Sequence, residues 1–438
     1  MKYLIGLDIG TSSVKGVLMS INGNLKSCKT QKHNYIVTNG FKTLDADDFC
    51  QTCFDVIGEL ANEISDDDKI IAICSSGASG NLVFVKDGMA VSPVYGWQNN
   101  YDESIIDKVL SNIEADHVYH TVGWGKIKSF PLAALAYFKQ TNPELLIGAD
   151  MICMHIEYLN YRLTGNWGIT PSMGTPFYLI NQETEDYEPK YLEILGINKS
   201  QLPEIMPNCS VLGNLDEYAS QKTGLEQGIP VILGTFDHPS AARGAGVLNE
   251  NEVLISCGTS WVVLVPYCKR CIPQSKRMMT DPFMHPNGNW CGMKSMESVS
   301  DTIDGYIKKY LGDISFAELD ALADEAPIGA NGLTIDDNTD VSGYSRNDIA
   351  RAIMESIAKG VDDFLKTYAE DAEIIRLVGG ITNSKVWCRV ISEITGKDVS
   401  VVNGEHAGAV GAAIMAGVGV GEYKNEADAF EMIYREVE

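Results

Sequence analysis

The stretch LDIGTSSVKGVLM (residues 7–19) returns in altered form as LISCGTSWVVLV (residues 254–265). Each stretch has an apolar run, a Gly-Thr-Ser turn and a second apolar run, which predicts two strands joined by a tight turn. A unit that recurs at the start of each half of a chain is typical of a duplicated domain. The repeat therefore predicts two like halves, each opening on the same strand–turn–strand unit.

Around these two units, buried strands alternate with helices along the chain. Short apolar runs predict strands at residues 3–9, 70–74, 230–233, 253–256, 374–378 and 399–402. Helical spacing of apolar residues predicts helices near 45–64, in much of 104–165, and after a capping box formed by Ser345 and Asp348. This alternation indicates α/β layering, and 438 residues are too many for one ordinary core. We predict two α/β domains, residues 1–245 and 246–438.

Composition and charge exclude several classes of function. The chain has 59 acidic and 34 basic residues, a formal net charge of −25, which repels nucleic acid and anionic membranes. No apolar run reaches the roughly 18–20 residues of a bilayer span, and the run before Asp8 is too short for a signal peptide. We expect a cytoplasmic protein that binds a small molecule and neither nucleic acid nor membrane.

The eleven cysteines form no regular framework, which is typical of a reducing compartment. Two Cys-x-x-Cys pairs occur, Cys50/Cys53 and Cys268/Cys271, and together they offer four thiolates to a zinc ion. The first pair lies in a stretch with helical spacing, and the second follows an apolar strand. We therefore favour structural cysteines over a zinc site.

The first glycine turn has the residues that a phosphate site needs. Asp8 lies at the end of the first predicted strand, and Gly10, Thr11 and Ser12 follow it. Glycine lets the backbone approach a phosphate, and consecutive N–H groups form a nest for an anion. Asp8 is placed to hold a hydrated Mg²⁺, which takes one or two carboxylates together with phosphate oxygens. The alternative is an ordinary hairpin in which Asp8 only accepts hydrogen bonds from the turn.

Two further glycine turns also follow buried strands. Gly258 and Thr259 repeat the first turn without its carboxylate. Gly379, Gly380 and Asn383 belong to the third turn, where a glycine pair allows adenine and its ribose to lie against the backbone. A single Gly-Gly pair is usually only a turn, so this interpretation depends on the other two turns.

A second carboxylate, Asp237, lies where a buried strand gives way to a helix of small residues. Pro239 fits the first turn of that helix. Phosphoryl transfer to an alcohol requires a carboxylate that accepts the hydroxyl proton, so Asp237 is a candidate general base. The alternative is that Asp237 only caps the helix. His238 is a candidate either for a sugar contact or for a structural hydrogen bond.

The ordered set of motifs resembles the FGGY family of carbohydrate kinases, within the superfamily of actin, hexokinase and Hsp70. The resemblance covers nearly the whole chain and is carried by GLDIGTSSVKG (6–16), HIEYLNYRLTG (155–165), GTFDHPSAARGAG (234–246), ISCGTSWV (255–262), VGGITNSKVW (378–387) and GAVGAAIMAGVGVG (408–421). It implies an α/β fold of two ribonuclease H-like, actin-like ATPase domains with the active site in the cleft between them.

The resemblance implies an ATP-dependent sugar kinase that transfers the γ-phosphate of Mg²⁺-bound ATP to a hydroxyl of a ketose, polyol or related sugar. It implies Asp8 as the magnesium-associated aspartate and Asp237 as the catalytic base. The nucleotide-binding residues that it implies are Gly10, Thr11, Ser12, Lys15, Gly258, Thr259, Gly379, Gly380 and Asn383.

Two regions depart from the family pattern. Many pentulose kinases carry a Gln-Met-His type sequence where this chain has GASGN (77–81), and Trp-x-Asp where it has WQN (97–99). The sugar-binding residues that we expect are Ser79, Asn81, Trp97, Asn99, Asp237 and His238. We expect an unusual acceptor, because a site built on hydroxyl contacts discriminates strongly by them. Residues 329–343 are shorter than is usual in the family and lack its Gly-Glu-Arg-x-Pro pattern, which weighs against the family's usual surface near the nucleotide and against an oligomer contact there. We allow for a homodimer without assigning its interface.

Two other functions are compatible with the same fold. One is a catalytically weak sensor of sugar or nucleotide, which the altered sugar loop and the short 329–343 stretch favour. The other is a sugar-independent ATPase of the actin or chaperone type. ADP release with and without added sugar separates the three.

Overall fold

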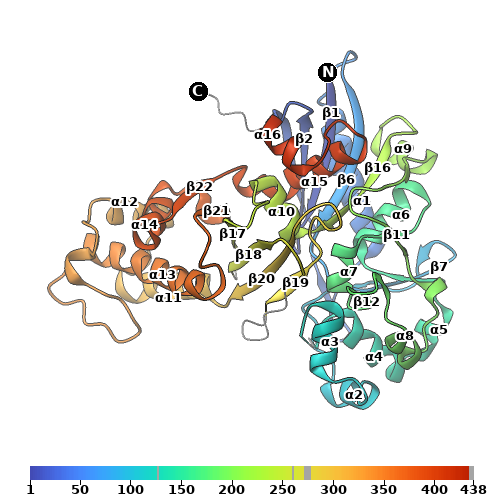
Figure 1. Cartoon of the computed structure of the whole chain (residues 1–438), viewed down its shortest axis with the longest axis horizontal. Helices are drawn as coiled ribbons and strands as arrows, with labels where there is room; N and C mark the ends of the chain where they lie inside the picture. The colour runs from blue at the N-terminus through green and yellow to red at the C-terminus, as the bar shows by residue number, and fades with distance from the viewer. Residues whose placement is uncertain (126–127, 259–260, 271–277, 434–438) are drawn as a thin grey trace. The chain divides into compact units, whose positions relative to one another are not determined.

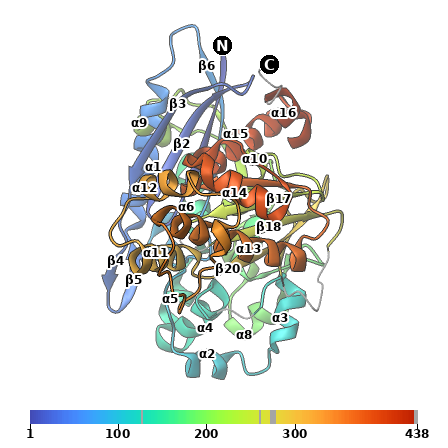
Figure 2. The same ribbon diagram turned by 90° about the vertical axis from the view of Figure 1, so that its left-hand side faces the viewer.

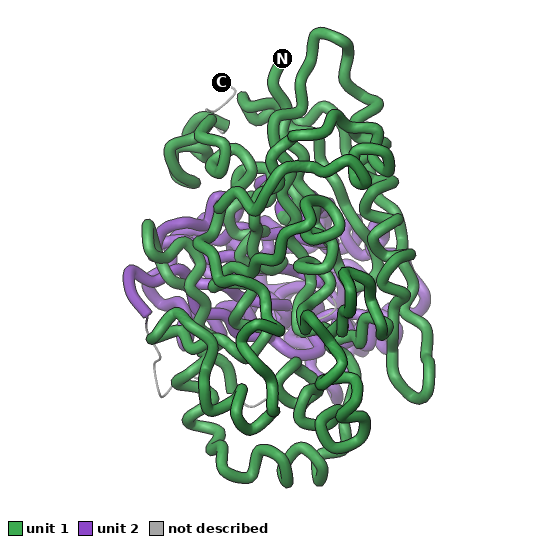
Figure 3. The backbone as a smooth tube through the Cα atoms, turned by 90° about the vertical axis from the view of Figure 1, so that its right-hand side faces the viewer, with its two compact units in different colours: residues 1–244, 279–290, 408–438 green, residues 245–278, 291–407 purple. Residues whose placement is uncertain are grey.

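A computed structural model of the chain describes residues 1–125, 128–258, 261–270 and 278–433 (Figure 1). The chain forms two compact units, drawn in green and purple in Figure 3. Unit 1 comprises Met1–Gly244, Met279–Trp290 and Gly408–Glu438, and unit 2 comprises Ala245–Met278 and Cys291–Ala407. The division into domains at residue 245 stays a prediction about which segments fold independently.

A six-stranded sheet, in the order β15-β16-β6-β1-β2-β3, forms the centre of unit 1. Its strands are β1 (Lys2–Ile9), β2 (Ser13–Ser20), β3 (Leu25–Lys32), β6 (Lys69–Gly77), β15 (Val211–Asn214) and β16 (Pro230–Phe236). Strands β1 to β3 form an antiparallel meander, whereas β6 runs parallel to β1 and β16 runs parallel to β6. The three parallel strands therefore end at the same edge of the sheet.

Helices and short strands surround this sheet. The helices of unit 1 and its boundary are α1 (Ala46–Ala61), α2 (Glu103–Val109), α3 (Ala115–Val122), α4 (Pro131–Thr141), α5 (Pro143–Gly148), α6 (His155–Thr164), α7 (Pro171–Phe177), α8 (Pro189–Leu195), α9 (Glu217–Thr223), α10 (Asp237–Ala245), α15 (Ala407–Gly419) and α16 (Glu426–Ile433). The short strands are β4 (Ile36–Thr38), β5 (Phe41–Leu44), β7 (Val83–Lys86), β8 (Met89–Ala90), β9 (Val94–Tyr95), β10 (Met151–Cys153), β11 (Gly168–Ile169), β12 (Ile180–Asn181), β13 (Asp186–Tyr187) and β14 (Glu204–Ile205). Helix α1 packs against β2 and β3 (Figure 2).

Helix α15 packs so closely against β1 that the two backbones are in contact. A methyl group on Gly6 of β1 would lie 2.0 Å from the carbonyl oxygen of Ala409, so only glycine permits this approach. The residues of α15 from Ala407 to Ala416 are all buried. The prediction that this glycine- and alanine-rich stretch forms a tightly packed buried helix is confirmed.

Unit 2 is built on the sheet β19-β20-β18-β17-β21-β22. These strands are β17 (Glu252–Cys257), β18 (Trp261–Tyr267), β19 (Met279–Asp281), β20 (Trp290–Met296), β21 (Ile374–Gly379) and β22 (Asp398–Val401). By their contacts, all of β19 and the first residue of β20, Trp290, belong to unit 1. The helices are α11 (Val299–Tyr310), α12 (Phe316–Asp324), α13 (Arg346–Tyr368) and α14 (Lys385–Thr395). As predicted, Ser345 and Asp348 form a capping box at the start of α13.

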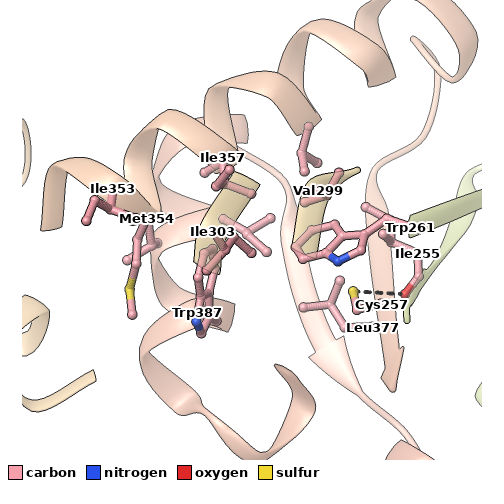
Figure 4. Close-up of a cluster of buried hydrophobic side chains, with 14 of the residues drawn as sticks. Ile255, Cys257, Trp261, Val299, Ile303, Ile353, Met354, Ile357, Leu377 and Trp387 are labelled. Atoms are coloured by element: carbon pink, nitrogen blue, oxygen red, sulfur yellow. Dashed lines mark hydrogen bonds between the residues drawn. The ribbon is translucent and has the colours of Figure 1, made fainter. Parts of the chain in front are cut away.

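The core of unit 2 lies between its sheet and these helices (Figure 4). Trp261 from β18 and Trp387 from α14 are both fully buried, with ring centroids 6.3 Å apart in an edge-to-face arrangement. Ile303 of α11 and Ile357 of α13 belong to the same cluster. Edge-to-face aromatic pairs are a favourable arrangement within such a core.

The two sheets share one plan. In unit 1, β1 pairs antiparallel with β2 and parallel with β6; in unit 2, β17 pairs antiparallel with β18 and parallel with β21. The two repeated sequence stretches are these hairpins, β1–β2 and β17–β18. The prediction of two like α/β halves is therefore confirmed.

Candidate active site

Two carboxylates, Asp8 and Asp237, lie at the same edge of the unit 1 sheet. Asp8 is the penultimate residue of β1 and is paired with Ser76 of β6. Phe236, the last residue of β16, is paired with Gly77 of β6, and Asp237 follows it as the first residue of α10. Only the end of β6 separates the two acidic residues, because β6 is the neighbour of both strands. Figure 1 shows these three strands side by side.

The electrostatics of Asp8 favour a cation at this edge. Burial, together with a smaller effect of the Asp237 charge, raises the pKa of Asp8 to about 7, and Lys15 opposes both effects. Lys15 is the residue directly opposite Asp8 on β2. Two carboxylates that repel one another are stabilised by a proton or a metal ion between them. The pair fits a magnesium ion that is bound by carboxylates together with substrate phosphates.

Within the described residues, no group of three or more His, Cys, Asp or Glu side chains is arranged to hold a metal ion. Cys50 and Cys53, one half of the zinc alternative, are buried in α1, and Cys268 is exposed. Cys271 lies outside the described residues.

The turn of residues 10–13 is tightly closed. The backbone N–H of Gly10 donates to the carbonyl of Ser13 at 2.9 Å. The Trp97 indole N–H donates to Thr11 Oγ1 at 3.3 Å, and Ser12 is exposed. This contact brings together two predicted groups, the phosphate turn and the 97–99 stretch, which are 86 residues apart in sequence.

The predicted sugar residues divide into accessible and buried ones. Ser79 is half-buried and Trp97 is exposed, whereas Asn81 and Asn99 are buried. The side-chain amide of Asn99 makes two hydrogen bonds with the backbone of Lys42: Oδ1 accepts the Lys42 N–H at 2.6 Å, and Nδ2 donates to the Lys42 carbonyl at 2.9 Å. The amide of Asn81 is likewise engaged inside the protein, with His155 and Ala78. In this structure the two asparagines hold the loops that carry Ser79 and Trp97.

Asp237 and His238 start helix α10, and both are half-buried. The backbone N–H of His238 donates to Asp237 Oδ1 at 2.8 Å, which fixes the orientation of the carboxylate. The helix is held by Arg243, a buried residue whose guanidinium bonds Glu426 Oε1 at 3.2 Å and the carbonyl oxygen of Phe283 at 2.9 Å. Arg243 thus links α10 to α16 and to the 279–290 segment of unit 1.

An aromatic cluster connects the Asp237 strand with the 77–81 loop. The Trp124 ring lies edge-on to Phe236 and to Phe130, with centroids 6.4 and 4.9 Å away. A methyl group on Gly80 would lie 2.3 Å from the Phe130 ring, so Phe130 packs directly on the loop. Trp124 is buried, and among the described residues its indole N–H has no hydrogen-bond partner.

In unit 2, two predicted nucleotide turns lie at the ends of neighbouring parallel strands. Cys257 of β17 is paired with Gly379 of β21. Gly379 has a φ of 97° and a methyl group there would lie 2.5 Å from the Cys257 carbonyl oxygen, so this position requires glycine. Gly258 follows directly after β17. Thr259 lies outside the described residues.

The predicted adenosine-binding turn continues from Gly379 as a short 3-10 helix, Gly380–Asn383, which leads into α14. Asn383 is exposed, and Ser384 caps α14 by accepting the N–H of Trp387. The turn therefore presents Gly380 and Asn383 at the start of a helix, beside the end of β17.

Sequence reasoning missed three residues that shape the site. Gly408 of α15 contacts the Asp8 carboxylate, Arg243 anchors α10, and Trp124 packs beside Phe236. The small residues of GAVGAA at 408–413 were the available signal for the first, since glycines in a helix often mark close backbone approach. For Arg243 and Trp124 the partners come from distant segments, and nothing local in the sequence indicates them.

No helix among the described residues combines the length and the apolar character that crossing a bilayer requires.

Comparison with known proteins agrees with this geometry. Residues 3–244 match the N-terminal domain, and residues 325–420 the C-terminal domain, of the FGGY family of carbohydrate kinases. A xylulose kinase of Bacillus subtilis (strain 168) is 23% identical over 461 residues, which span 100% of this chain and 92% of the relative. An autoinducer-2 kinase of Enterobacter sp. (strain 638) is 24% identical over 488 residues, 99% of this chain and 89% of the relative.

The fold is also that of solved kinase structures. The structure of a ligand-bound xylulose kinase from Lactobacillus acidophilus superimposes with a TM-score of 0.86 at 20% sequence identity. The match covers 99% of this chain and 92% of the chain of that structure. This likeness shows the two-domain actin-like ATPase fold that the motifs implied. With more than half of its residues matched to the N-terminal domain alone, the chain belongs to the FGGY family of carbohydrate kinases.

Proposed function

We propose that the protein transfers the γ-phosphate of ATP to a hydroxyl group of a small open-chain sugar or polyol. The observation that carries this proposal is the placement of Asp8 and Asp237 at the ends of β1 and β16, separated only by β6. One carboxylate is needed at the phosphates and another at the acceptor hydroxyl. The family membership supports the same reaction.

Asp237 is the general base in this proposal. The backbone N–H of His238 donates a hydrogen bond to Asp237 Oδ1, and this bond fixes the direction in which Oδ2 points. That oxygen accepts the proton of the acceptor hydroxyl as the oxygen–phosphorus bond forms, and ADP leaves. Accepting the proton at a positioned carboxylate typically contributes about 10²–10⁴-fold to the rate.

The nucleotide is assigned to the three glycine turns. In unit 1, Gly10, Thr11, Ser12 and Lys15 would contact the terminal phosphates, because glycine and consecutive N–H groups suit an anion. The turns of unit 2 would hold the remainder of the nucleotide, with these residues: Gly258, Thr259, Gly379, Gly380 and Asn383. When bound, Mg²⁺ would neutralise phosphate charge, and Asp8 is the residue that would hold it.

The acceptor is assigned to the surface formed by Ser79, Trp97 and His238 around Asp237. Asn81 and Asn99 support this surface from behind, since their amides are bonded within the protein. The indole N–H of Trp124 is the further donor that we assign to a substrate hydroxyl, because it has no partner among the described residues and an unpaired buried donor is costly. Relatives named xylulose kinase and autoinducer-2 kinase support a short-chain ketose or a related hydroxycarbonyl compound as acceptor.

The test is sugar-dependent release of ADP over a panel of ketoses, deoxyketoses, polyols and aldonates. Asp237→Asn should lower kcat by about 10²–10⁴-fold while ATP still binds. Asp216→Asn is the matched control, because Asp216 also begins a helix, as the N-cap of α9, and asparagine caps equally well. If both variants keep full activity, Asp237 is only a cap. Binding of ATP with no ADP release for any sugar would instead favour a sensor.

A further inference from the structure

A layer of three buried rings lies between the phosphate turn and the 77–81 loop of unit 1. The layer consists of His33, Phe49 and His155. The rings of Phe49 and His155 are stacked with centroids 4.8 Å apart, and Phe49 meets the His33 ring edge-on at 6.1 Å. All three side chains are buried. We call this set the His–Phe layer.

One end of the His–Phe layer is bonded to the 77–81 loop through Asn81. The backbone N–H of His155 donates to Asn81 Oδ1 at 2.8 Å, and Asn81 Nδ2 lies 3.1 Å from His155 Nδ1. The same Nδ2 donates to the Ala78 carbonyl at 3.3 Å. Because the Asn81 oxygen accepts from the backbone, its NH₂ group faces the imidazole, and Nδ1 of His155 must act as an acceptor. The bond therefore requires a neutral His155.

The other end of the layer is bonded to the phosphate turn. The backbone N–H of His33 donates to the Ser12 carbonyl at 3.2 Å. Burial lowers the pKa of the His33 imidazole. Among the described residues neither of its ring nitrogens has a hydrogen-bond partner, so the backbone bond is the link to the turn. A third hydrogen bond joins the 77–81 loop directly to the strand that precedes the phosphate turn, because the Ala78 N–H donates to the Ile9 carbonyl at 2.7 Å.

We propose that Asn81 and His155 are positioning residues that couple the 77–81 loop to the phosphate turn through the His–Phe layer. The loop and the turn are then ordered together, so that disturbing one loosens the other. This proposal rests on the proposed function only in naming the loop as the acceptor side and the turn as the phosphate side. The coupling itself is a property of the fold and can be measured without substrate.

The surroundings of His155 keep it neutral. Burial, together with a smaller effect of the nearby His33, lowers the pKa of His155 to about 3. Burial also raises the pKa of Glu157 to about 8 and raises the pKa values of the Cys50 and Cys153 thiols, so these neighbours offer no negative charge at pH 7. The elements that carry the layer also bear charged groups, among them Lys32, Asp45, Asp47, Asp48, Asp55, Glu59 and Arg162. The Asn81–His155 bond is therefore intact across the neutral range.

The first experiment is hydrogen exchange of the full chain without ligands. Asn81→Ala should raise the exchange rate about fivefold in peptides that cover residues 77–83 and also in those that cover residues 9–14, because a buried hydrogen bond contributes about 1 kcal/mol. Asn181→Ala is the matched control, since its amide bonds Glu188 and the N–H of Glu183, away from the layer. Faster exchange at 77–83 with an unchanged turn at 9–14 would overturn the coupling.

The second experiment uses pH, and it stays informative if Asn81→Ala unfolds. In Asn81→Asp, a carboxylate replaces the NH₂ group that donates to the Ala78 carbonyl, and only an added proton on that carboxyl group restores the donor. Protection of both segments should therefore be low at pH 8 and rise by about tenfold or more toward pH 5, after correction for intrinsic exchange rates. The wild type and Asn181→Asp should show no such rise. A pH response confined to 77–83 in Asn81→Asp, or none at all, would overturn the proposal.

Activity gives an independent readout. Asn81→Ala should raise KM for both ATP and the sugar, although Asn81 is placed against neither. A protein that releases no ADP with any sugar contradicts the proposed function but leaves the exchange results valid. A raised KM for sugar alone would show that Asn81 acts on the acceptor side only.

Discussion

Gly408 of α15 lies against the carboxylate of Asp8, so that a methyl group on Gly408 would lie 2.5 Å from Asp8 Oδ2. One turn further along, a methyl group on Gly411 would lie 1.8 Å from the carbonyl oxygen of Ser240 in α10. Ser240 Oγ also donates to the Gly408 carbonyl at 2.8 Å. One glycine-lined helix therefore sets the positions of both the Asp8 carboxylate and the helix that begins with Asp237.

Gly408→Ala should displace Asp8 and lower kcat by about tenfold or more, because a misplaced group at a reaction centre is costly even at 1 Å. The control is Gly360→Ala in α13, an exposed helical glycine with no atom within 4 Å of the added methyl. That change should leave kcat unaltered and stabilise the protein by about 0.5–1 kcal/mol. Steady-state kinetics and urea unfolding of both variants make the comparison. Unchanged kcat in Gly408→Ala would show that Asp8 tolerates the shift.

Local sequence patterns were sufficient for the elements and for the paired hairpins of this fold. The GTS repeat, the periodicity after Ser345 and the small residues of 407–416 correspond to β1–β2 with β17–β18, to α13 and to α15. Such features depend on residues that are neighbours in sequence, so they can be predicted from a single sequence.

The roles of Asn81 and Asn99 could not be predicted in the same way. Both were expected in the sugar site, yet their amides bond His155 and Lys42, which lie 74 and 57 residues away. Long-range partners of this kind leave no periodic signal. The same holds for the return of residues 279–290 to unit 1, where Asp281 accepts hydrogen bonds from Ser172 and Thr175.

Arg243→Ala should destabilise the protein by about 3–5 kcal/mol, because it leaves the other members of a buried ion pair without their partner. The lost guanidinium bonds Glu426, Pro239 and Phe283. Arg389→Ala is the control, since its ion pair with Asp324 is about half exposed and such pairs contribute roughly 0–1 kcal/mol. The midpoint of urea unfolding reports the difference. Equal effects of the two changes would contradict the anchoring role of Arg243.

Trp97→Phe should raise KM for ATP by up to about fivefold and leave the fold intact. The change keeps an aromatic ring but removes the hydrogen bond from Nε1 to Thr11 Oγ1 at 3.3 Å, and a bond of this kind is worth about 0.5–1.5 kcal/mol. Trp167→Phe is the control, because Trp167 stacks on Tyr161 at 4.1 Å, on another element. An unchanged KM for ATP in Trp97→Phe would show that the bond does not order the turn.

Glu157 should make the protein less stable as the pH rises from about 4.5 to about 8. Its side chain is buried at the start of α6, where Oε2 accepts the Met154 N–H at 3.1 Å. Burial raises its pKa from 4.5 to about 8, so in this window the folded protein holds a proton that the unfolded chain has released. A folded state that binds more protons loses stability with rising pH, by about 1.4 kcal/mol per pH unit for one such group.

Glu157→Gln tests this directly, because glutamine mimics the protonated acid and can still accept the Met154 N–H. Urea unfolding between pH 5 and pH 8 should show a downward slope in the wild type that is shallower in the variant by about 1.4 kcal/mol per pH unit. Asp8 and Asp281, whose pKa values burial also raises, keep their own contributions to the slope. Glu217→Gln is the control, an exposed residue in the first turn of α9 whose replacement should keep the slope. A wild-type slope that persists undiminished in Glu157→Gln would assign the lost proton to another buried group, of which Asp281, with a pKa raised by burial to about 7, is the first to examine by Asp281→Asn.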